Sequence, residues 1–365
     1  MKRLSVAVAA SLCASAFALP SRAQNPDPID IRACTAIESD AQRLACYDHA
    51  TGRVNLPIAQ KRVDDSSRTP DIFSSDRPKS PAAEAGINRE VATPLSLLDS
   101  RWELAPESKL GTFNIRGYKP VYVLPAFVTS NQNSRPRSPN PDNTVADQSA
   151  RADNVEAKFQ LSLKAKVWQG VFGDAGDVWV AYTQSSRWQV YNSTLSRPFR
   201  ETNYEPEAML VFDTHYRVLG WDGRLLGIGV NHQSNGRGDP LSRNWNRIIA
   251  SVGFERPGWT VMIQPWWRVP ESFRNDDNPD ISDYMGRAEM QIVHESHSQE
   301  FGMMLRHSLR GGARSHGAVR LSWSFPVAGN LRGYMEVFKG YGESLIDYNH
   351  NASYLGIGIS LLEWY

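Results

Sequence analysis

The sequence predicts an all-β fold, an antiparallel transmembrane β-barrel of about twelve strands that follows a small helical extension. Three observations predict it. A secretory leader is followed by no apolar stretch long enough for a membrane helix, long alternating runs fill the chain from residue 110, and the last run ends on an aromatic residue. Barrel strands alternate apolar and polar residues, so a mean hydropathy of −0.45 is compatible with a membrane role through strands.

The first residues indicate a secretory signal peptide. Lys2 and Arg3 precede an apolar run that ends at Leu19, and small residues lead to a cleavage point after Ala23. The run is short for a spanning helix, and no later stretch approaches the roughly 18 consecutive apolar residues that such a helix needs. We therefore expect residues 1–23 to be removed and the chain to be exported across a bacterial inner membrane.

The next segment, residues 24–53, contains the two cysteines that remain after cleavage, Cys34 and Cys46. In an oxidising periplasm these two are expected to pair, and the residues between them have a helical pattern. We therefore expect a small stapled helical unit in which the disulfide is a structural clip rather than a redox centre. Residues 54–109 are polar and rich in Pro and Ser, which predicts a linker and lead-in without a core of its own.

Residues 110–365 have a different pattern, in which aromatic and β-branched residues alternate with polar ones in runs of about ten or more. An even number of long strands favours a closed barrel, because closure leaves no exposed edge. Short and long gaps between the runs favour turns at one rim and loops at the other, the pattern of outer-membrane barrels. The expected strands are 113–129, 155–169, 176–190, 203–219, 223–235, 243–256, 258–269, 282–295, 298–308, 314–326, 329–341 and 350–365.

The last run, YLGIGISLLEWY, places apolar residues and the terminal Tyr365 on one face and mostly Gly and Ser on the other. It resembles the C-terminal signal of outer-membrane proteins, which implies recognition by the outer-membrane assembly machinery. Acidic residues of the C-terminal strands, such as Glu336 and Glu343, are expected to line a polar interior.

Charge and histidine spacing give no reason to expect a nucleic-acid partner or a histidine metal site. With 40 basic and 39 acidic residues the net charge is +1, which gives no reason to expect a nucleic-acid partner. His294 and His297 have a spacing that suits metal ligation on a helix. On a strand these two side chains point to opposite faces, so we expect ordinary barrel or turn residues.

The residues that indicate chemistry lie in GIGVNHQSNGRGDPLSRNWNRIIASVGF, residues 227–254. Strand parity places His232 and Ser234 on the apolar face of the first strand, and Asn246 on the apolar face of the returning strand. In a barrel that face meets lipid, where polar groups are costly unless they pair with one another. A Ser hydroxyl needs an adjacent base to act as a nucleophile. We therefore expect His232 to accept the Ser234 proton while Asn246 accepts the second imidazole N–H.

The string NHQSNGRGDPLSRNWNR resembles the signature of the outer-membrane phospholipase A family, and so do SRPFRETNYEPE (196–207), DDNPDI (276–281) and GYGESLIDYN (340–349). The resemblance implies a calcium-dependent, dimeric enzyme on a twelve-strand barrel that cleaves the sn-1 and sn-2 acyl esters of phospholipids and lysophospholipids. Its site would face the outer leaflet of the bacterial outer membrane. The implied roles are Ser234 as nucleophile, His232 as base, Asn246 as orienting residue, Gly236 as oxyanion donor, Arg237, Ser242 and a second copy's Ser196 as calcium positions, and Asp277 as a secondary calcium position.

Calcium is a mechanistic expectation as well as a family attribute, because a neutral Asn246 stabilises the imidazolium only weakly. A bound Ca²⁺, held by loop carbonyls, a hydroxyl and waters, would stabilise the oxyanion. Arg197, beside Ser196, stands where the family suggests a small residue, and its charge is expected to weaken calcium binding. Gln184 points towards lipid, where a lone polar group favours self-association through interchain hydrogen bonds. It also matches a dimer-interface glutamine of the family. The alternative is that Gln184 lies among the lipid head groups.

Two other classes of protein remain open on the sequence alone. One is a non-enzymatic barrel, either a narrow porin or a surface-binding protein, in which His232 and Ser234 have no chemical role. The other is a soluble periplasmic esterase, which the long amphipathic strands and the terminal aromatic residue disfavour. Conductance, calcium-dependent release of fatty acid and membrane fractionation distinguish the three.

Overall fold

The computed structural model describes residues 34, 36–37, 39–50, 96–145, 152–329 and 331–363. The chain divides into two units, Met1–Thr69 and Pro70–Tyr365. The expected signal peptide, most of the expected linker and Tyr365 lie outside the described residues. Within the described residues, no helix has both the length and the apolar character needed to cross a membrane.

The described part of the first unit is a short helix held by a disulfide. Helix α1 spans Asp40–Ala50, and Cys46 on this helix is bonded to the buried Cys34. The Arg43 guanidinium donates a hydrogen bond to the carbonyl of Ile37, which lies between the two cysteines. The predicted pairing of Cys34 with Cys46 in a small helical unit is therefore confirmed.

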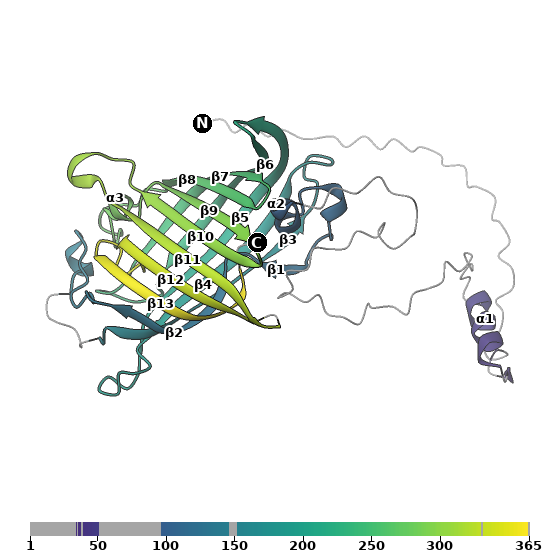
Figure 1. Cartoon of the computed structure of the whole chain (residues 1–365), viewed down its shortest axis with the longest axis horizontal. Coiled ribbons are helices and arrows are strands. Elements are labelled where there is room, and N and C mark those ends of the chain that lie inside the picture. The colour runs from purple at the N-terminus through teal and green to yellow at the C-terminus, as the bar shows by residue number, and fades with distance from the viewer. Residues whose placement is uncertain are drawn as a thin grey trace, which may run out of the picture. The chain divides into compact units, whose positions relative to one another are not determined.

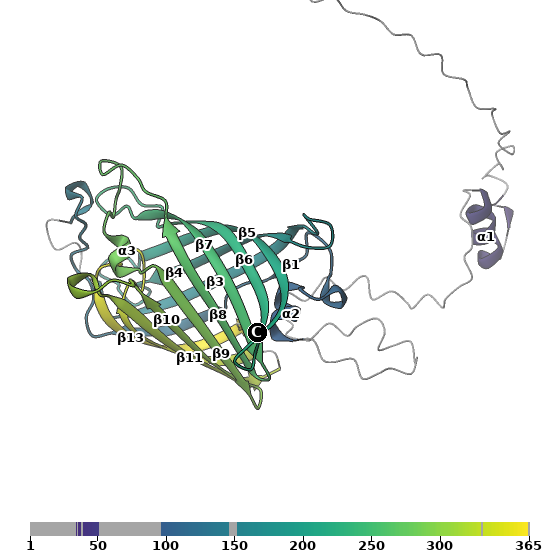
Figure 2. The same ribbon diagram turned by 90° about the horizontal axis from the view of Figure 1, so that it is seen from above.

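The second unit is a closed antiparallel barrel (Figures 1 and 2). Strands β2 to β13 each pair with their neighbours in sequence, and β13 pairs with β2 to close the sheet. This confirms the predicted barrel of twelve strands. The strands are β2 (Val121–Thr129), β3 (Val155–Trp168), β4 (Asp177–Trp188), β5 (Phe199–Val218), β6 (Trp221–Ser234), β7 (Asn244–Arg256), β8 (Trp259–Arg268), β9 (Ala288–Ser296), β10 (Gln299–His307), β11 (Gly317–Ala328), β12 (Leu331–Tyr341) and β13 (Asn351–Leu362).

Two expected strands differ most from those observed. The run 113–129 is split into β1 (Ile115–Gly117) and β2, which both pair with β3. The break contains Pro120, which has no N–H to donate to a ladder. Strand β9 begins at Ala288 rather than at residue 282, because α3 (Ile281–Tyr284) precedes it. Ile281 and Met285 lie one helical turn apart and are both buried, so burial favours a helical turn there.

The connections at the two ends of the barrel differ in length. At one end, turns as short as Leu219–Gly220 and Pro257–Gly258 join adjacent strands. At the other end, which we call the loop rim, the connections include residues 189–198, 235–243 and 269–287. Helix α3 lies at the loop rim, and α2 (Leu97–Trp102) lies at the opposite end (Figures 1 and 2). The short-turn and long-loop pattern expected from the sequence is therefore present.

The outer wall of the barrel is apolar, as strand parity predicts. Along β6, Leu226, Ile228 and Val230 are 47%, 52% and 58% exposed, whereas Leu225 and Asn231, which have the opposite parity, are buried. Apolar side chains on the outside of a closed sheet are the arrangement that a lipid environment stabilises. The wall that carries His232 and Ser234 is therefore the one that faces the hydrocarbon.

The interior of the barrel is ionic. Lys158 Nζ lies 2.6 Å from Glu336 Oε1 and 2.9 Å from Glu343 Oε1, and the Arg187 guanidinium also contacts Glu343 at 2.7 Å. Charges taken out of water need such partners, because an unpaired buried charge costs several kcal/mol. Glu336 and Glu343 therefore lie inside the barrel, as predicted.

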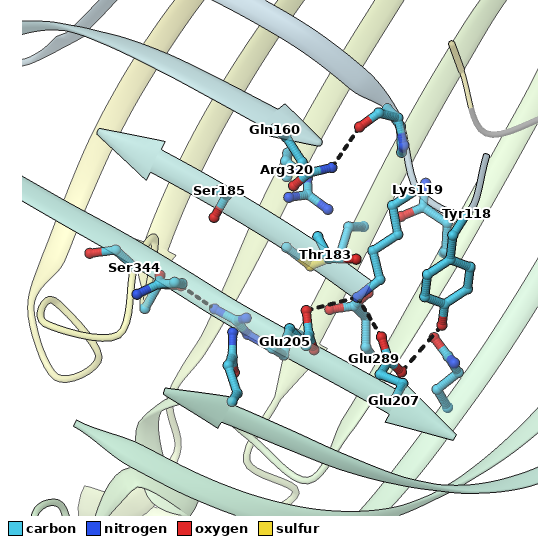
Figure 3. A pocket seen from close by; sticks show the side chains of 18 of the residues that line it. Tyr118, Lys119, Gln160, Thr183, Ser185, Glu205, Glu207, Glu289, Arg320 and Ser344 are labelled. Carbon is cyan, nitrogen blue, oxygen red and sulfur yellow. Dashed lines mark hydrogen bonds and ion pairs between the residues drawn. The ribbon is translucent and has the colours of Figure 1, made fainter. Parts of the chain in front are cut away.

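A second ionic group surrounds a cavity of about 170 Å³ in the lumen (Figure 3). Lys119 Nζ lies 2.9 Å from Glu205 Oε2 and 3.2 Å from Glu207 Oε1, and Arg247 reaches Glu205 from β7 at 2.9 Å. The alternating charges hold strands β5 and β7 to the segment that contains Lys119. Paired charged side chains thus occupy this part of the interior.

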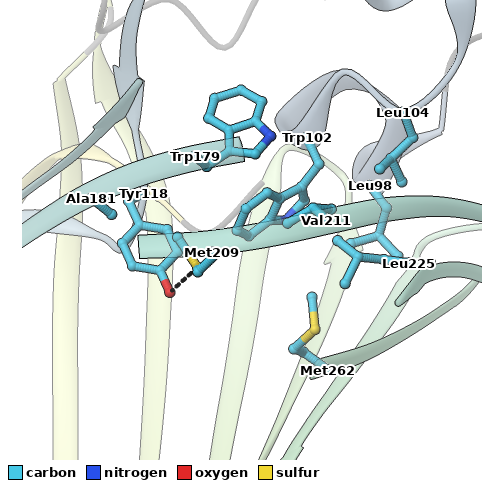
Figure 4. Close-up of a cluster of buried hydrophobic side chains, with 10 residues drawn as sticks. All are labelled: Leu98, Trp102, Leu104, Tyr118, Trp179, Ala181, Met209, Val211, Leu225 and Met262. Carbon is cyan, nitrogen blue, oxygen red and sulfur yellow. Dashed lines mark hydrogen bonds between the residues drawn. The ribbon is translucent and has the colours of Figure 1, made fainter. Parts of the chain in front are cut away.

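The chain segment before the barrel differs from the expected linker. The expected linker 54–109 ends in helix α2 and a 3-10 turn, Pro106–Ser108. The side chains of Leu98 and Trp102 lie one turn apart on α2 and are both buried. They join an apolar cluster with residues of β4, β5, β6 and β8 (Figure 4). The last residues of that segment therefore belong to the barrel.

Trp102 is the largest contribution of α2 to this cluster. Its ring packs edge-on against Tyr118 and Trp179, at 5.8 Å between centroids in both cases. Lys164 Nζ lies 3.2 Å from the Trp102 ring centroid, so the ring also offers its face to a buried ammonium group.

We expect Trp102→Ala to lower the free energy of unfolding by about 3–5 kcal/mol, because it leaves a cavity and removes the aromatic face from Lys164. Urea titration of the protein in detergent micelles measures this change. Leu110→Ala is the matched control, because Leu110 lies in the same segment and is 50% exposed. Equal free energies of unfolding for the two variants would show that the packing of α2 does not stabilise the barrel.

Candidate active site

The β6–β7 hairpin positions the predicted nucleophile, base and orienting residue. Its register pairs His232 with Asn246 and Ser234 with Asn244. The connecting loop is closed by Asn235, whose backbone N–H donates to the Arg243 carbonyl and whose Oδ1 accepts from the Arg243 N–H, both at 3.0 Å. This closure holds the start and the end of the loop together directly above the last residue pair of the hairpin.

His232 and Asn246 are in direct contact on the outer wall. His232 Nδ1 lies 2.8 Å from Asn246 Oδ1. Ser234 is two residues further along β6, so it lies on the same face as His232, and it is half-buried. The neighbouring outward residues Val230 and Ile248 are exposed and apolar. The structure therefore brings a hydrogen-bonded His–Asn pair and a Ser to one place, where the apolar wall meets the loop rim.

Gly236 follows Ser234 in the loop and needs the conformation that glycine allows. Its φ is +62°, and a Cβ at this position would lie 3.0 Å from the ring of Tyr204. Tyr204 is itself the β5 partner of Ser234. Any side chain at position 236 would therefore strain the backbone and press on the residue beside Ser234.

The structure brings two of the predicted calcium positions together. Ser242 Oγ donates to Asp277 Oδ2 at 2.5 Å, and Asn244 Nδ2 donates to the same oxygen at 2.6 Å. Arg237 lies in the same β6–β7 loop as Ser242, and its guanidinium donates to the carbonyl of Phe199 at 3.1 Å. The β6–β7 loop and the β8–β9 loop thus meet around an oxygen-rich group at the loop rim.

Ser196 lies on a different loop, between β4 and β5, and is exposed. Ser196 and Arg197 both have left-handed backbone angles, with φ values of 59° and 54°. The Arg197 carbonyl accepts a hydrogen bond from the indole N–H of Trp188 at 2.9 Å. The loop therefore leaves Ser196 and Arg197 exposed at the loop rim.

The donor chemistry at the loop rim suits calcium. Among the residues that the structure describes, no group of three or more His, Cys, Asp or Glu side chains could hold a metal ion. Calcium accepts hydroxyl, carbonyl and water oxygens, whereas zinc and iron need nitrogen, sulfur or several carboxylates. The hydroxyls of Ser196 and Ser242 and the carbonyl of Arg237 are donors of the first kind. Because these donors are few, a calcium ion here would need waters and a second chain to complete its shell.

Gln184 lies on the outer face of β4, between Leu161 of β3 and Tyr204 of β5. Its Oε1 accepts a hydrogen bond from the exposed hydroxyl of Tyr182 at 3.0 Å. Sequence parity predicts the outward direction of this side chain but does not reveal the Tyr182 partner. Gln184 is therefore a residue of the same outer wall that carries Ser234.

Sequence reasoning missed Glu271, which lies in the β8–β9 loop. Asn246 Nδ2 donates to Glu271 Oε1 at 3.5 Å. Burial raises the pKa of the Glu271 carboxyl, and the guanidinium of Arg268 opposes that change. The loop has no alternating pattern, so no sequence signal places this side chain beside Asn246.

The two histidines with metal-like spacing have separate surroundings. His294 stacks on Trp259, with 4.1 Å between ring centroids, and its Nδ1 contacts the Gly258 carbonyl. His297 lies in the β9–β10 turn with a left-handed φ of 51°. Both are therefore residues of the short-turn end of the barrel.

Comparison with known proteins identifies the family. A family model described as phospholipase A1 matches residues 98–361. A putative phospholipase A1 of Neisseria meningitidis serogroup B is 34% identical over 346 residues, which are 89% of each chain.

Two solved structures resemble the barrel closely. A Salmonella typhi outer membrane phospholipase dimer with bound calcium has a TM-score of 0.61 and 37% identity, over 69% of this chain and 94% of that one. An active-site Asn-to-Ala mutant of outer membrane phospholipase A from Escherichia coli has a TM-score of 0.63 and 34% identity, over 74% and 100%. Since the family model matches most of the chain and the solved relatives have the same closed sheet, the chain is an outer-membrane β-barrel of the phospholipase A1 family.

Proposed function

We propose that the chain hydrolyses the sn-1 and sn-2 acyl esters of phospholipids and lysophospholipids that reach the outer leaflet. Ser234 is the nucleophile, His232 the general base and Asn246 the orienting residue. The observation that carries the proposal is the 2.8 Å contact between His232 Nδ1 and Asn246 Oδ1 on the lipid-facing wall, with Ser234 two residues from His232 on the same face. The Asn-to-Ala active-site mutant of the Escherichia coli relative supports an asparagine in this role.

The direction of the His232–Asn246 bond determines which imidazole nitrogen acts as the base. Asn246 Oδ1 can only accept a hydrogen bond, so the proton of a neutral imidazole is held on Nδ1. Nε2 is then free to accept the Ser234 proton during attack on the ester carbonyl. The alcohol leaves with a proton from His232, and water cleaves the acyl-enzyme with His232 again as base.

The developing oxyanion needs a donor, and the loop after Ser234 provides one. The Gly236 N–H, held by a left-handed turn, is the proposed donor. Ser242, the Arg237 carbonyl and Ser196 of a second copy would hold Ca²⁺, which supplies positive charge for the oxyanion when bound. Asp277 would serve a secondary calcium position. The calcium-bound dimer of the Salmonella typhi relative supports both the ion and the dimer.

The position on the outer wall suits a substrate that never leaves the bilayer. Exposed apolar residues such as Val230, Ile248 and Trp267 surround the site, so the acyl chains can lie along the barrel. Because neither ester position is measured by an enclosed pocket in this arrangement, both chains should be cleaved.

Purified protein in mixed micelles, given a phospholipid with different labels in its two acyl chains, tests the proposal. Calcium-dependent release of both labelled fatty acids is expected. Ion conductance without release of fatty acid would instead support a porin, although the paired charges in the lumen favour the enzyme.

We expect Gln184→Ala to weaken the dimer several-fold, since interchain hydrogen bonds in a membrane contribute about 0.6–2 kcal/mol each. Chemical crosslinking in calcium and lipid measures the dimer, and fatty-acid release measures its effect. Gln299→Ala is a matched control, because Gln299 bonds an outward aromatic residue, Trp323, on a different part of the wall. The control should keep the dimer, and a monomeric Gln184→Ala variant with full activity would contradict the role of the dimer.

The ends of the chain complete the proposal. Residues 1–23 direct export, and Tyr365 contributes to recognition by the outer-membrane assembly machinery. Membrane insertion and hydrolysis can be measured separately, the first as the amount of protein in the outer membrane and the second as the activity per inserted molecule.

A further inference from the structure

Asn246 has a polar partner at each end of its amide group. Its Oδ1 contacts His232 Nδ1 at 2.8 Å, and its Nδ2 donates to Glu271 Oε1 at 3.5 Å. Glu271 is a loop residue, in the connection between β8 and β9, and is half-buried. The three side chains thus form a chain of polar contacts that begins in the loop and ends at the imidazole.

The loop that contains Glu271 is tied to the same strand. The N–H of Val269 donates to the backbone carbonyl of Asn246 at 2.8 Å. The Arg268 guanidinium donates to Asp276 Oδ1 at 2.6 Å and to the carbonyl of Asn278 at 3.2 Å. These contacts hold the loop on both sides of Glu271, so Glu271 is placed beside Asn246 by the fold.

The orientation of the Asn246 amide decides whether His232 can act as a base. An amide turned by 180° would present its NH₂ group to Nδ1. Nδ1 would then have to accept, the proton of the neutral imidazole would move to Nε2, and Nε2 could no longer take the Ser234 proton. A carboxylate opposite the amide prevents this, because an ionised carboxylate only accepts hydrogen bonds and therefore attracts the NH₂ end.

We propose that Glu271 is a positioning residue for the hydrolysis, which fixes the Asn246 amide with its oxygen towards His232. This inference rests on the proposed function. The Glu271 charge also polarises the amide towards the imidazole, so it stabilises the imidazolium that forms during attack and offsets the neutrality of Asn246. The contact is long in the resting enzyme, and hydrogen bonds of this kind shorten in the reacting complex.

Charged groups of both signs surround Glu271. Arg268 on β8 favours the ionised carboxylate, whereas Asp276 and Asp277 in the same loop disfavour it. His232, on β6, is the group across Asn246. A negative Glu271 lies across Asn246 from the imidazole and stabilises positive charge there, so its loss should move the acidic limb of the activity profile to lower pH.

Steady-state kinetics of the full mature protein in calcium-containing mixed micelles test the inference. We expect Glu271→Gln to lower kcat several-fold with KM unchanged and to move the acidic limb of the activity profile to lower pH. Glu271→Ala, which removes the acceptor as well, should lower kcat by on the order of 10-fold. The control is Ser272→Ala, which alters the neighbouring exposed residue of the loop and should match the wild type.

The outcomes separate this inference from the proposed function. If the wild type is active, Ser234→Ala is inactive and both Glu271 variants have the wild-type kcat and pH profile, the positioning role is wrong while the proposed function stands. A lower urea midpoint for the Glu271 variants, without any change in kcat or in the acidic limb, would also overturn it, because that result describes a purely structural residue.

Discussion

Replacement of Ser234 by Ala is expected to lower the rate of fatty-acid release by on the order of 10⁴-fold or more. The variant keeps the barrel, the His232–Asn246 contact and the surrounding apolar wall, because the lost hydroxyl is a single half-buried atom. What it loses is the only proposed acceptor of the acyl group, so no acyl-enzyme can form. The measurement is hydrolysis of a radiolabelled or fluorescent phospholipid by equal amounts of folded protein.

A second serine provides the control for this comparison. Ser353 lies on the outward, exposed face of β13, so Ser353→Ala also removes a hydroxyl from the lipid-facing wall. It should leave the rate unchanged. Activity of Ser234→Ala within a few-fold of the Ser353→Ala value would contradict the proposed nucleophile.

Removal of calcium is expected to have the next largest effect, a loss of about 10²- to 10³-fold, which is the usual cost of losing one oxyanion-stabilising group. Asn246 is neutral and stabilises the imidazolium only weakly, so a larger share of the transition-state stabilisation must come from groups that contact the oxyanion. The proposed donors are hydroxyls and a carbonyl, which bind calcium more weakly than a cluster of carboxylates does. Chelation followed by titration with free Ca²⁺ measures both the loss and the concentration needed for recovery.

Two variants locate the ion in that titration. Ser242→Ala should raise the calcium concentration for half-maximal activity, whereas Arg197→Ala should lower it, because Arg197 places a cation beside Ser196. Full activity in excess chelator would contradict the role of calcium. The same titration curve for both variants and the wild type would place the ion elsewhere.

The fold was predictable where alternation is long and regular. The twelve barrel strands follow from parity, since a closed sheet with an apolar outside and a polar inside must alternate. The errors arise where a local cause interrupts the pattern. Pro120 splits the first strand. The strand β9 begins later in the sequence than expected, because the burial of Ile281 and Met285 favours a helical turn before it. Helix α2 was not predicted, because Leu98 and Trp102 are the two residues that bury it and they lie within a polar stretch of sequence.

The candidate site was predictable to the extent that it lies on a hairpin. The contact between His232 and Asn246 follows from the β6–β7 register and from the face that both residues share. The approach of Asp277 to Ser242 and of Glu271 to Asn246 could not be derived in this way. Both depend on how the β8–β9 loop folds back over the hairpin, and loop contacts leave no periodic trace in a sequence.

Covalent labelling tests the central claim, a nucleophilic Ser234 activated by His232 on the lipid-facing wall, most directly. The reagent is a fluorophosphonate with a long alkyl chain, added to the protein in calcium-containing micelles, and peptide mass spectrometry locates the adduct. The account predicts one adduct, on Ser234, formed in step with the loss of hydrolysis and absent from His232→Ala. Loss of hydrolysis with the adduct on another residue, or labelling of Ser234 that does not need His232, would contradict it.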